Sequence, residues 1–187
     1  MKAGFALTGS FCTFSKVIPQ ISKLIEAGFE VIPIMSEISY DTDTRFGKAE
    51  DFRSEIKRIT GNEIINTIVG AEPIGPKNLL DILIIAPCTG NTLGKLSGGV
   101  TDTCVTMAAK AHLRNGKPVV IAVSTNDALG ASARNIGNLL NARNIFFVPM
   151  RQDDIIRKPT SLVAEFDLIP QTVDEALKGR QIEPILK

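Results

Sequence analysis

The sequence predicts an α/β fold, a Rossmann-like three-layer sandwich with a mainly parallel sheet. Five short apolar runs lie at residues 4–8, 31–35, 82–86, 119–123 and 145–148, and such runs are typical of parallel strands that are covered on both faces. Segments with helical spacing of apolar residues lie between them. This alternation predicts helices on both faces of the sheet. We expect a single domain over residues 1–187, with a less regular insert at about 39–78 and a C-terminal tail from about 150.

The composition is that of a soluble globular protein, with 44% hydrophobic and 22% charged residues and a net charge of +1. The near-neutral charge provides no basic surface for nucleic acid. No apolar run approaches the ~20 residues of a membrane span. The N-terminus lacks the layout of a signal peptide. The cysteines, Cys12, Cys88 and Cys104, have no metal-type spacing. We expect no metal and three free thiols in a cytoplasmic protein, with Cys12 and Cys104 facing the core.

The first 37 residues read as strand, helix, strand. After the strand at 4–8 comes a turn at 8–13. Apolar residues then recur at helical spacing up to Ala27, and Gly28 suits the end of a helix. The second strand ends in Ser36-Glu37. Gly9 and Ser10 lie where a phosphate could meet the first helix N-terminus. The dinucleotide fingerprint G-x-G-x-x-G is absent, because Gly9 is the only glycine in the turn.

The insert is predicted from weaker patterns. Residues 40–45 form a polar loop and 49–59 have the spacing of a helix, while 64–69 suit either a short helix or a strand. Residues 70–77 contain two prolines and two glycines, which predicts a loop just before the central strand.

The central stretch, residues 79–112, holds the main candidate site. We expect Pro87 to end its strand because proline has no N–H for the ladder. The small polar loop at 88–92 opens a helix, with Thr89 and Asn91 as N-cap types, and a second helix start follows at 98–102. Two helix starts facing one crevice favour an anionic or heterocyclic ligand. The alternative is an ordinary strand-to-helix turn with its caps. Cys88 is either a thiol activated at a helix start or a plain small loop residue.

The remaining chain continues the alternation. The strand at 119–123 ends in a second polar loop at 124–127, a helix is predicted at 135–142, and the next strand follows at 145–148. The tail has helical patches at 161–166 and 172–178.

These motifs resemble a known family. The segment PCTGNT at 87–92, followed by Lys95-Leu96 and GVTD at 99–102, is similar to the signature of the flavin-binding cysteine-decarboxylase type flavoproteins, which carry P-x-S-A-N-T and then G-x-x-D. The turn at 8–10 resembles their first flavin loop. Stretches at 71–76, 87–92, 107–111, 124–127 and 144–149 resemble one branch of that family more closely, the B component of a two-component oxidoreductase of spore-forming bacteria.

The resemblance implies a Rossmann-like flavoprotein that binds FMN and assembles into trimers or multiples of trimers, with each site completed by a neighbouring copy. For this branch it implies oxidation of a small dicarboxylate, dihydrodipicolinate, to dipicolinate in the cytoplasm of the mother cell during sporulation. The partner, the A subunit of that oxidoreductase, is expected to carry NADP. The alternatives are a flavin-fold scaffold or regulatory protein without chemistry of its own, and a decarboxylase or prenyltransferase-type flavoprotein.

One departure concerns the histidine that the decarboxylases use in the loop before the central strand. That place holds Pro73 here, beside Glu72. Glu72 is either a substitute proton acceptor or a solvated loop carboxylate, and no other catalytic residue is assigned. The single histidine, His112, is predicted to be a surface or interface residue. Without an imidazole in the loop, we expect no decarboxylation by the family mechanism.

The candidate flavin contacts are small or hydroxyl-bearing residues that follow the predicted strands, and each could instead be a cap or turn residue: Gly9, Ser10, Ser36, Thr89, Gly90, Asn91, Thr92, Thr101, Asp102, Ser124 and Thr125. A dianionic substrate needs cationic partners. The candidates are Lys95, Lys110 and Arg134, for which a solvated or dipole-pairing role is the alternative.

Overall fold

The computed structural model describes all residues, 1–187, and its centre is one seven-stranded sheet. The strand order is β2-β1-β3-β4-β7-β6, and β5 also pairs with β4. The bounds are Lys2–Leu7 for β1, Glu30–Met35 for β2, Ile82–Cys88 for β3, Val119–Thr125 for β4, Ile145–Phe147 for β5, Met150–Asp154 for β6 and Lys158–Ala164 for β7. β1 to β5 pair in parallel, and β7 pairs antiparallel with both β4 and β6. The mainly parallel sheet and its five predicted strands are confirmed.

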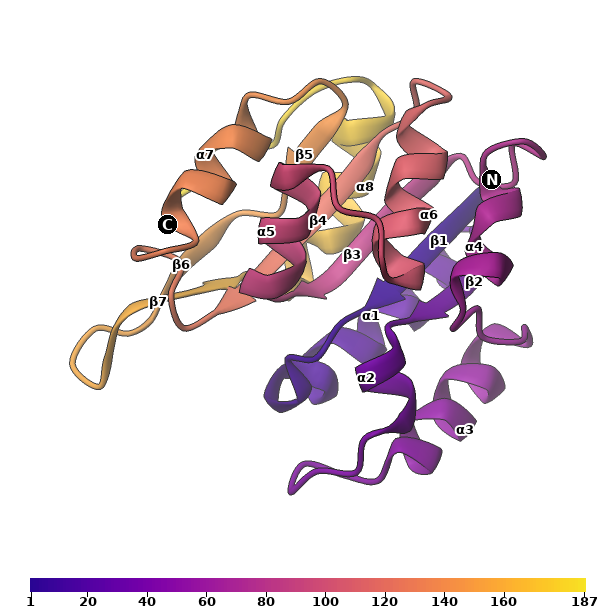
Figure 1. Cartoon of the computed structure of the whole chain (residues 1–187), viewed down its shortest axis with the longest axis horizontal. Helices are drawn as coiled ribbons and strands as arrows, with labels where there is room; N and C mark the ends of the chain where they lie inside the picture. Colours follow the sequence, from indigo (N-terminus) through magenta and orange to yellow (C-terminus); the bar gives the residue numbers. More distant parts are fainter.

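Helices cover both faces of the sheet (Figure 1). They are α1 Phe14–Glu26, α2 Glu37–Asp41, α3 Ala49–Thr60, α4 Ile68–Ala71, α5 Gly90–Gly98, α6 Cys104–Leu113, α7 Ala133–Leu140 and α8 Ile169–Leu177, with 3-10 turns at Phe11–Thr13, Glu72–Ile74 and Phe166–Leu168. None of the helices is long and apolar enough to cross a lipid bilayer.

Two hydrophobic cores lie on the two faces, because successive strand residues point to opposite sides. Phe5 and Ile84 pack in one core with α1, α3 and α8. Their neighbours Ala6 and Ile85 pack in the other core with α4, α5, α6 and α7. The molecule is therefore a three-layer sandwich, as the sequence predicts.

The central strand runs further than predicted. β3 continues through Pro87, and Cys88 pairs with Val123 of β4 after a register shift between Ile85 and Cys88. The prediction that Pro87 ends the strand is wrong, because the irregular register accommodates a residue that has no N–H to donate. Cys88 is a fully buried strand residue, and burial raises the pKa of its thiol. This favours the role of a plain small residue for Cys88 over that of an activated thiol.

The tail departs from prediction in one place. Residues 161–166, predicted as a helical patch, lie mainly in β7, which forms an antiparallel hairpin with β6. The second patch is confirmed by α8. The tip of this hairpin exposes Ile155 and Ile156, and the hairpin extends as an arm at the left of Figure 1. Exposed polar residues fill most of β6, so no apolar run marks it as a strand.

The insert is more regular than expected. Residues 70–77 contain the end of α4 and the 3-10 turn Glu72–Ile74, where the sequence predicts only a loop. Gly75 packs so closely on α6 that an added Cβ would lie 2.8 Å from the carbonyl oxygen of Ala111. The second helix of the central stretch, α6, starts at Cys104 with Thr103 as N-cap, slightly later than the predicted start.

Two predictions about side-chain exposure are wrong. Cys12 is exposed, whereas Cys104 is buried and donates its S–H to the carbonyl oxygen of Met35 at 2.8 Å. His112 is only 1% exposed, so it is not a surface residue. Its Nε2 lies 3.0 Å from the carbonyl oxygen of Pro118, and because a carbonyl only accepts, Nε2 carries the proton.

His112 makes stability depend on pH. Burial lowers the pKa of its imidazole to about 4, whereas the unfolded chain has a value near ~6.5. The unfolded state therefore binds more protons between these two values, and the free energy of unfolding falls as the pH drops through this window, by about 3 kcal/mol from this residue. Urea unfolding of wild type and His112→Gln from pH 7 to pH 4 measures this. The variant should show the shallower dependence, and equal slopes would contradict the assignment.

Candidate functional site

A cleft lies at the carboxyl ends of the parallel strands and contains two adjoining cavities. The first, the α2-side cavity, has a volume of about 480 Å³, and the second, the hairpin-side cavity, about 490 Å³. Gly9 and Thr89 line both, so the cavities meet between the loops that follow β1 and β3. These volumes are in the range of small-molecule sites, ~300–1,000 Å³.

Most of the predicted flavin contacts come together here. The α2-side cavity is lined by Gly9, Ser36, Thr89, Asn91, Thr92 and Asp102. The hairpin-side cavity is lined by Gly9, Ser10, Thr89, Ser124 and Thr125. The loops converge because parallel strands end at one edge of the sheet.

Hydrogen bonds tie these loops to one another. The hydroxyl of Thr8 donates to the carbonyl oxygen of Pro87 at 2.6 Å and accepts from the N–H of Thr89 at 3.1 Å. The hydroxyls of Ser10 and Ser124 are 2.7 Å apart. The floor of the cleft is therefore held in place before any ligand binds.

Two helix starts beside the cleft leave N–H groups without an acceptor. Thr89 caps α5 by accepting from the N–H of Thr92, while the N–H groups of Gly90 and Asn91 make no hydrogen bond within the chain. The N–H groups of Phe11 and Cys12, before α1, are also without an acceptor. Free N–H groups and the helix dipole together favour an anion at such positions.

Gly90 is required by a polar cluster behind the loop. The carboxylate oxygen Oδ1 of Asp127 accepts from the hydroxyls of Thr125 at 2.6 Å and Ser132 at 3.0 Å, and these bonds hold the pKa of Asp127 below its usual value. A Cβ on Gly90 would lie 2.7 Å from both Thr125 Oγ1 and Asp127 Oδ1 and 2.8 Å from Ser132 Oγ. Only glycine lets the start of α5 pack against this cluster.

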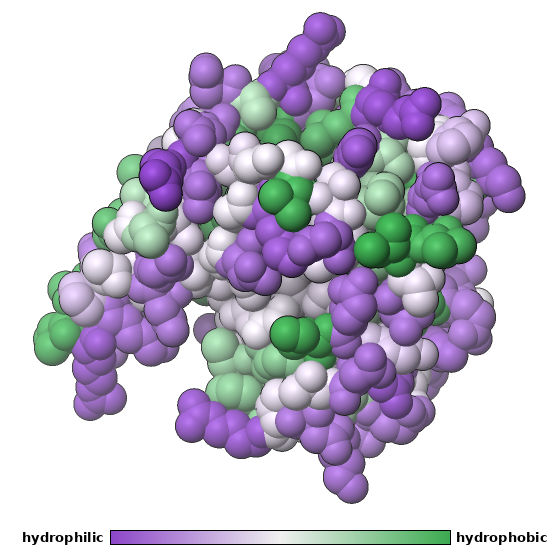
Figure 2. Space-filling model, in the orientation of Figure 1, coloured by the Kyte–Doolittle hydropathy of each residue, from purple (hydrophilic) through white to green (hydrophobic).

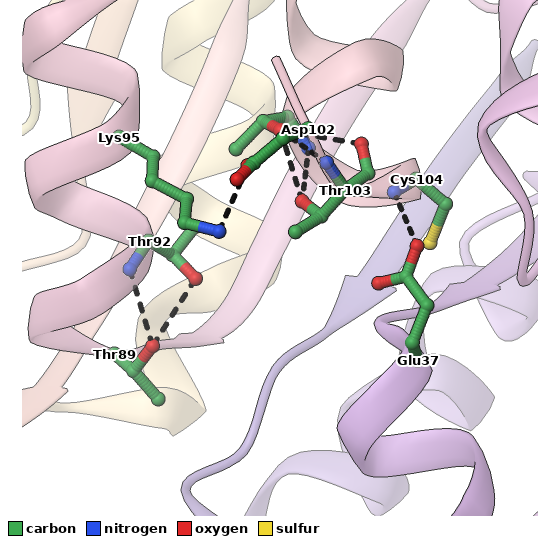
Figure 3. A network of polar contacts seen from close by, with 8 residues as sticks. Glu37, Thr89, Thr92, Lys95, Asp102, Thr103 and Cys104 are labelled. Atoms are coloured by element: carbon green, nitrogen blue, oxygen red, sulfur yellow. Dashed lines mark hydrogen bonds and ion pairs between the residues drawn. The ribbon is translucent and has the colours of Figure 1, made fainter. Parts of the chain in front are cut away.

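Each carboxylate that lines the cleft has a hydrogen-bond partner within the chain, and Figure 3 shows those of Glu37 and Asp102. Glu37 accepts from the N–H of Cys104 at 3.0 Å, at the start of α6. Asp102 pairs with Lys95 at 2.8 Å, and this hydrogen bond lowers the pKa of the Asp102 carboxyl. In the hairpin-side cavity, Asp153 pairs with Lys158 at 2.7 Å. Lysines therefore neutralise Asp102 and Asp153, and the N–H at the start of α6 holds the carboxylate of Glu37.

Several predicted residues do not line the cleft, among them Gly90. Thr101 and Lys110 line a separate cavity of about 290 Å³ between α5 and α6, which Lys95 also reaches. Arg134 is exposed on α7 and Glu72 is exposed on its 3-10 turn, and neither lines the cleft.

Several residues of the cleft are not among the predicted ones. Thr8 and Glu37 directly adjoin the predicted candidates Gly9 and Ser36. Their positions at the ends of strands could therefore have predicted them. Lys16, on α1, and Phe46, between α2 and α3, line the hairpin-side cavity. Neither follows a predicted strand, and only the fold brings them together.

Comparison with known proteins identifies relatives over the whole chain. The family model described as Flavoprotein matches residues 1–176. The B subunit of dipicolinate synthase from Bacillus subtilis (strain 168) is 49% identical over 185 residues, covering 99% of this chain and 92% of that protein. The crystal structure of the same subunit from Bacillus halodurans C is 47% identical with a TM-score of 0.92, over 100% of this chain and 95% of that one. Burkholderia xenovorans DmrB, solved in complex with FMN, is 15% identical with a TM-score of 0.71, over 95% of each chain.

Proposed function

Because the chain belongs to the flavoprotein family and is a close homologue of the dipicolinate synthase B subunit, we propose that it is the flavin-binding component of such an enzyme. In this proposal it acts with the A subunit of dipicolinate synthase to oxidise dihydrodipicolinate to dipicolinate during spore formation, in the cytoplasm of the mother cell. The observation that carries the proposal is the cleft itself, in which Asp102 and Asp153 are paired with lysines and two helix starts leave N–H groups free.

The cleft suits FMN on three counts. Its cavities are large enough for a small-molecule ligand, its floor is rich in hydroxyl groups, and its free N–H groups suit a phosphate. When bound, FMN supplies redox chemistry that no side chain of the cleft offers. We propose that the phosphate lies near Gly9, Ser10 and the loop from Thr89 to Thr92, with Ser36, Asp102, Ser124 and Thr125 as further contacts.

The chain's own residues would bind and orient rather than transfer protons. The Thr8 and Ser10–Ser124 hydrogen bonds hold the loops around the ligand. Since His112 is buried and outside the cleft, this chain offers no imidazole there, which disfavours the decarboxylase alternative. Glu72 is exposed away from the cleft of its own chain, so a proton-transfer role for it requires the cleft of a neighbouring copy.

The A subunit is the proposed partner and the carrier of NADP. The turn after β1 of the present chain lacks the glycine fingerprint of a dinucleotide site. Electrons leaving the substrate for a nicotinamide would then cross from this chain to its partner, either through the flavin or within a shared site.

FMN binding tests the cofactor assignment. Titration of FMN into the purified chain, followed by flavin absorption, should give saturable binding. Ser10→Ala and Asn91→Ala should each weaken it about tenfold, the effect of losing about one hydrogen bond to a charged group. Asn141→Ala, on the surface beyond α7, is the matched control and should bind FMN like wild type. Absence of saturable binding, or wild-type affinity in both cleft variants, would refute the assignment.

The chain is further proposed to form a homo-oligomer, a trimer or a multiple of trimers. The related DmrB is described as a cubic protein cage, and the net charge of +1 gives little repulsion between copies. Sedimentation velocity at micromolar concentration should give the mass of three chains or a multiple of three. A monomer would contradict the proposal.

A further inference from the structure

We propose that Lys16 and Phe46 recognise the dicarboxylate substrate at the mouth of the hairpin-side cavity. The Lys16 ammonium group would pair with one carboxylate, and the Phe46 ring would pack against the substrate ring. This inference rests on the proposed function and adds to it the part of the cleft that selects the substrate.

Lys16 has a charge that nothing in the chain neutralises. None of the ten ion pairs involves it. The other lysines of the cleft, Lys95 and Lys158, are paired with Asp102 and Asp153. Lys110 and Arg134 lie outside the cleft. Lys16 is therefore the cation of the cleft that is available to a carboxylate.

The acids of a second cavity beside Lys16 are already paired with other cations. Lys16 also borders a neighbouring cavity of about 400 Å³ that contains Glu165 and Asp167. Glu165 pairs with Arg151 at 2.5 Å, and Asp167 pairs with Lys23 at 2.7 Å. Because both carboxylates are paired with other cations, the ammonium group of Lys16 is free to face the hairpin-side cavity.

Phe46 is presented to the cavity by a tight turn. Thr44 and Gly47 exchange two backbone hydrogen bonds, of 3.0 and 3.2 Å. Gly47 has a φ of +151° and packs on the Phe52 ring, where an added Cβ would lie 2.7 Å from the ring. Phe46 is nevertheless 47% exposed, and the Arg45 guanidinium lies 4.8 Å from the centre of its ring. The turn thus leaves the Phe46 side chain half-exposed beside the cavity, where a ligand ring can pack against it.

Lys16 and Phe46 lie at the mouth of the cavity, whereas Ser10 and Ser124 lie deeper. Ser124 is 8% exposed, and its hydroxyl forms a hydrogen bond with the hydroxyl of Ser10 across the floor of the cleft. The space-filling view shows a notch between the arm at the left, which carries the β6–β7 hairpin, and the lower part of the molecule (Figure 2). A flavin along the floor would leave this mouth for a second, smaller ring. A cation beside an aromatic surface suits a cyclic carboxylate.

The test uses the FMN-loaded chain in complex with its partner protein, the A subunit. We would measure the KM for dihydrodipicolinate, and inhibition by dipicolinate and by picolinate, which lacks one carboxylate. Lys16→Ala should raise KM about 10- to 100-fold, the loss expected for one charge-assisted hydrogen bond. It should also reduce the preference for dipicolinate over picolinate and leave FMN affinity unchanged. Lys16→Arg should restore most of the affinity, and Phe46→Ala should weaken both inhibitors about equally.

Lys110→Ala is the matched control, since Lys110 is also unpaired and lines a cavity, but outside the cleft. It should leave every constant unchanged. An unaltered KM and inhibitor preference in Lys16→Ala, with an active complex, would overturn this inference and leave the proposed function standing. A complex without activity in the wild type would overturn the proposed function itself, and the inference with it.

Discussion

Replacing Gly90 with alanine is expected to lower FMN affinity at least about 30-fold and to destabilise the chain by about 2 kcal/mol. The new Cβ would displace the hydroxyls of Thr125 and Ser132 from Asp127. Each of these hydrogen bonds to a charged group is worth ~1.5–3 kcal/mol, and part of that is recovered when water replaces the lost donor. Displacing the 124–132 loop also moves the start of α5, whose free N–H groups form the proposed anion site.

Urea unfolding and FMN titration measure the two effects. The control is Gly137→Ala in α7, because a Cβ at Gly137 meets no atom within 4 Å. In a helix interior that exchange should stabilise the chain by up to ~1 kcal/mol. If Gly90→Ala instead behaved like Gly137→Ala, the close packing around the start of α5 would not be needed for folding or for the ligand.

Cysteine-decarboxylase activity is expected to be absent from the chain, whether free or in complex with its partner protein. General acid–base groups contribute typically ~100- to 10,000-fold in rate, and the cleft has no imidazole to supply one, since Pro73 occupies the expected place and His112 is buried. Carbon dioxide release from a peptide with a C-terminal cysteine measures this in the FMN-loaded chain. A peptidyl-cysteine decarboxylase with its own histidine is the positive control. Turnover comparable to that enzyme would contradict the assignment.

The parallel part of the fold could be predicted because its determinants are local. β1, β3 and β4 contain apolar runs that are buried on both faces, β2 and β5 contain partly buried ones, and helices between them have periodic apolar residues. The β6–β7 hairpin lacks this signal, because β6 has three consecutive exposed residues, Arg151, Gln152 and Asp153. Its pairing with β7 depends on the neighbouring strand rather than on its own pattern.

The candidate site was predictable where residues directly follow a strand. Ser10, Thr89 and Ser124 meet because the strands before them are parallel, and that much follows from the sequence. The requirement for glycine at position 90 does not follow from the sequence, because the three atoms that a Cβ would meet belong to residues 125–132. Lys110 and Arg134 carry charge and lie near the site loops along the chain, but the fold places both outside the cleft.

A role for Glu72 can be tested in the assembled enzyme. If Glu72 transfers a proton in the cleft of a neighbouring copy, Glu72→Gln should lower kcat by ~100-fold or more without changing FMN affinity. If it is a solvated carboxylate, the variant should match wild type. Asp174→Asn, an exposed acid on α8, is the control for the loss of one surface charge.

The measurement that most directly tests the central claim is dipicolinate formation from dihydrodipicolinate and NADP, with the partner protein alone, with this chain alone, and with both. We expect product in quantity only when both proteins and FMN are present, and a reduced rate when Asn91→Ala replaces the wild-type chain at subsaturating FMN. Full activity of the complex with Asn91→Ala and without FMN would leave this chain as a scaffold. Full activity of the partner protein alone would contradict the claim outright.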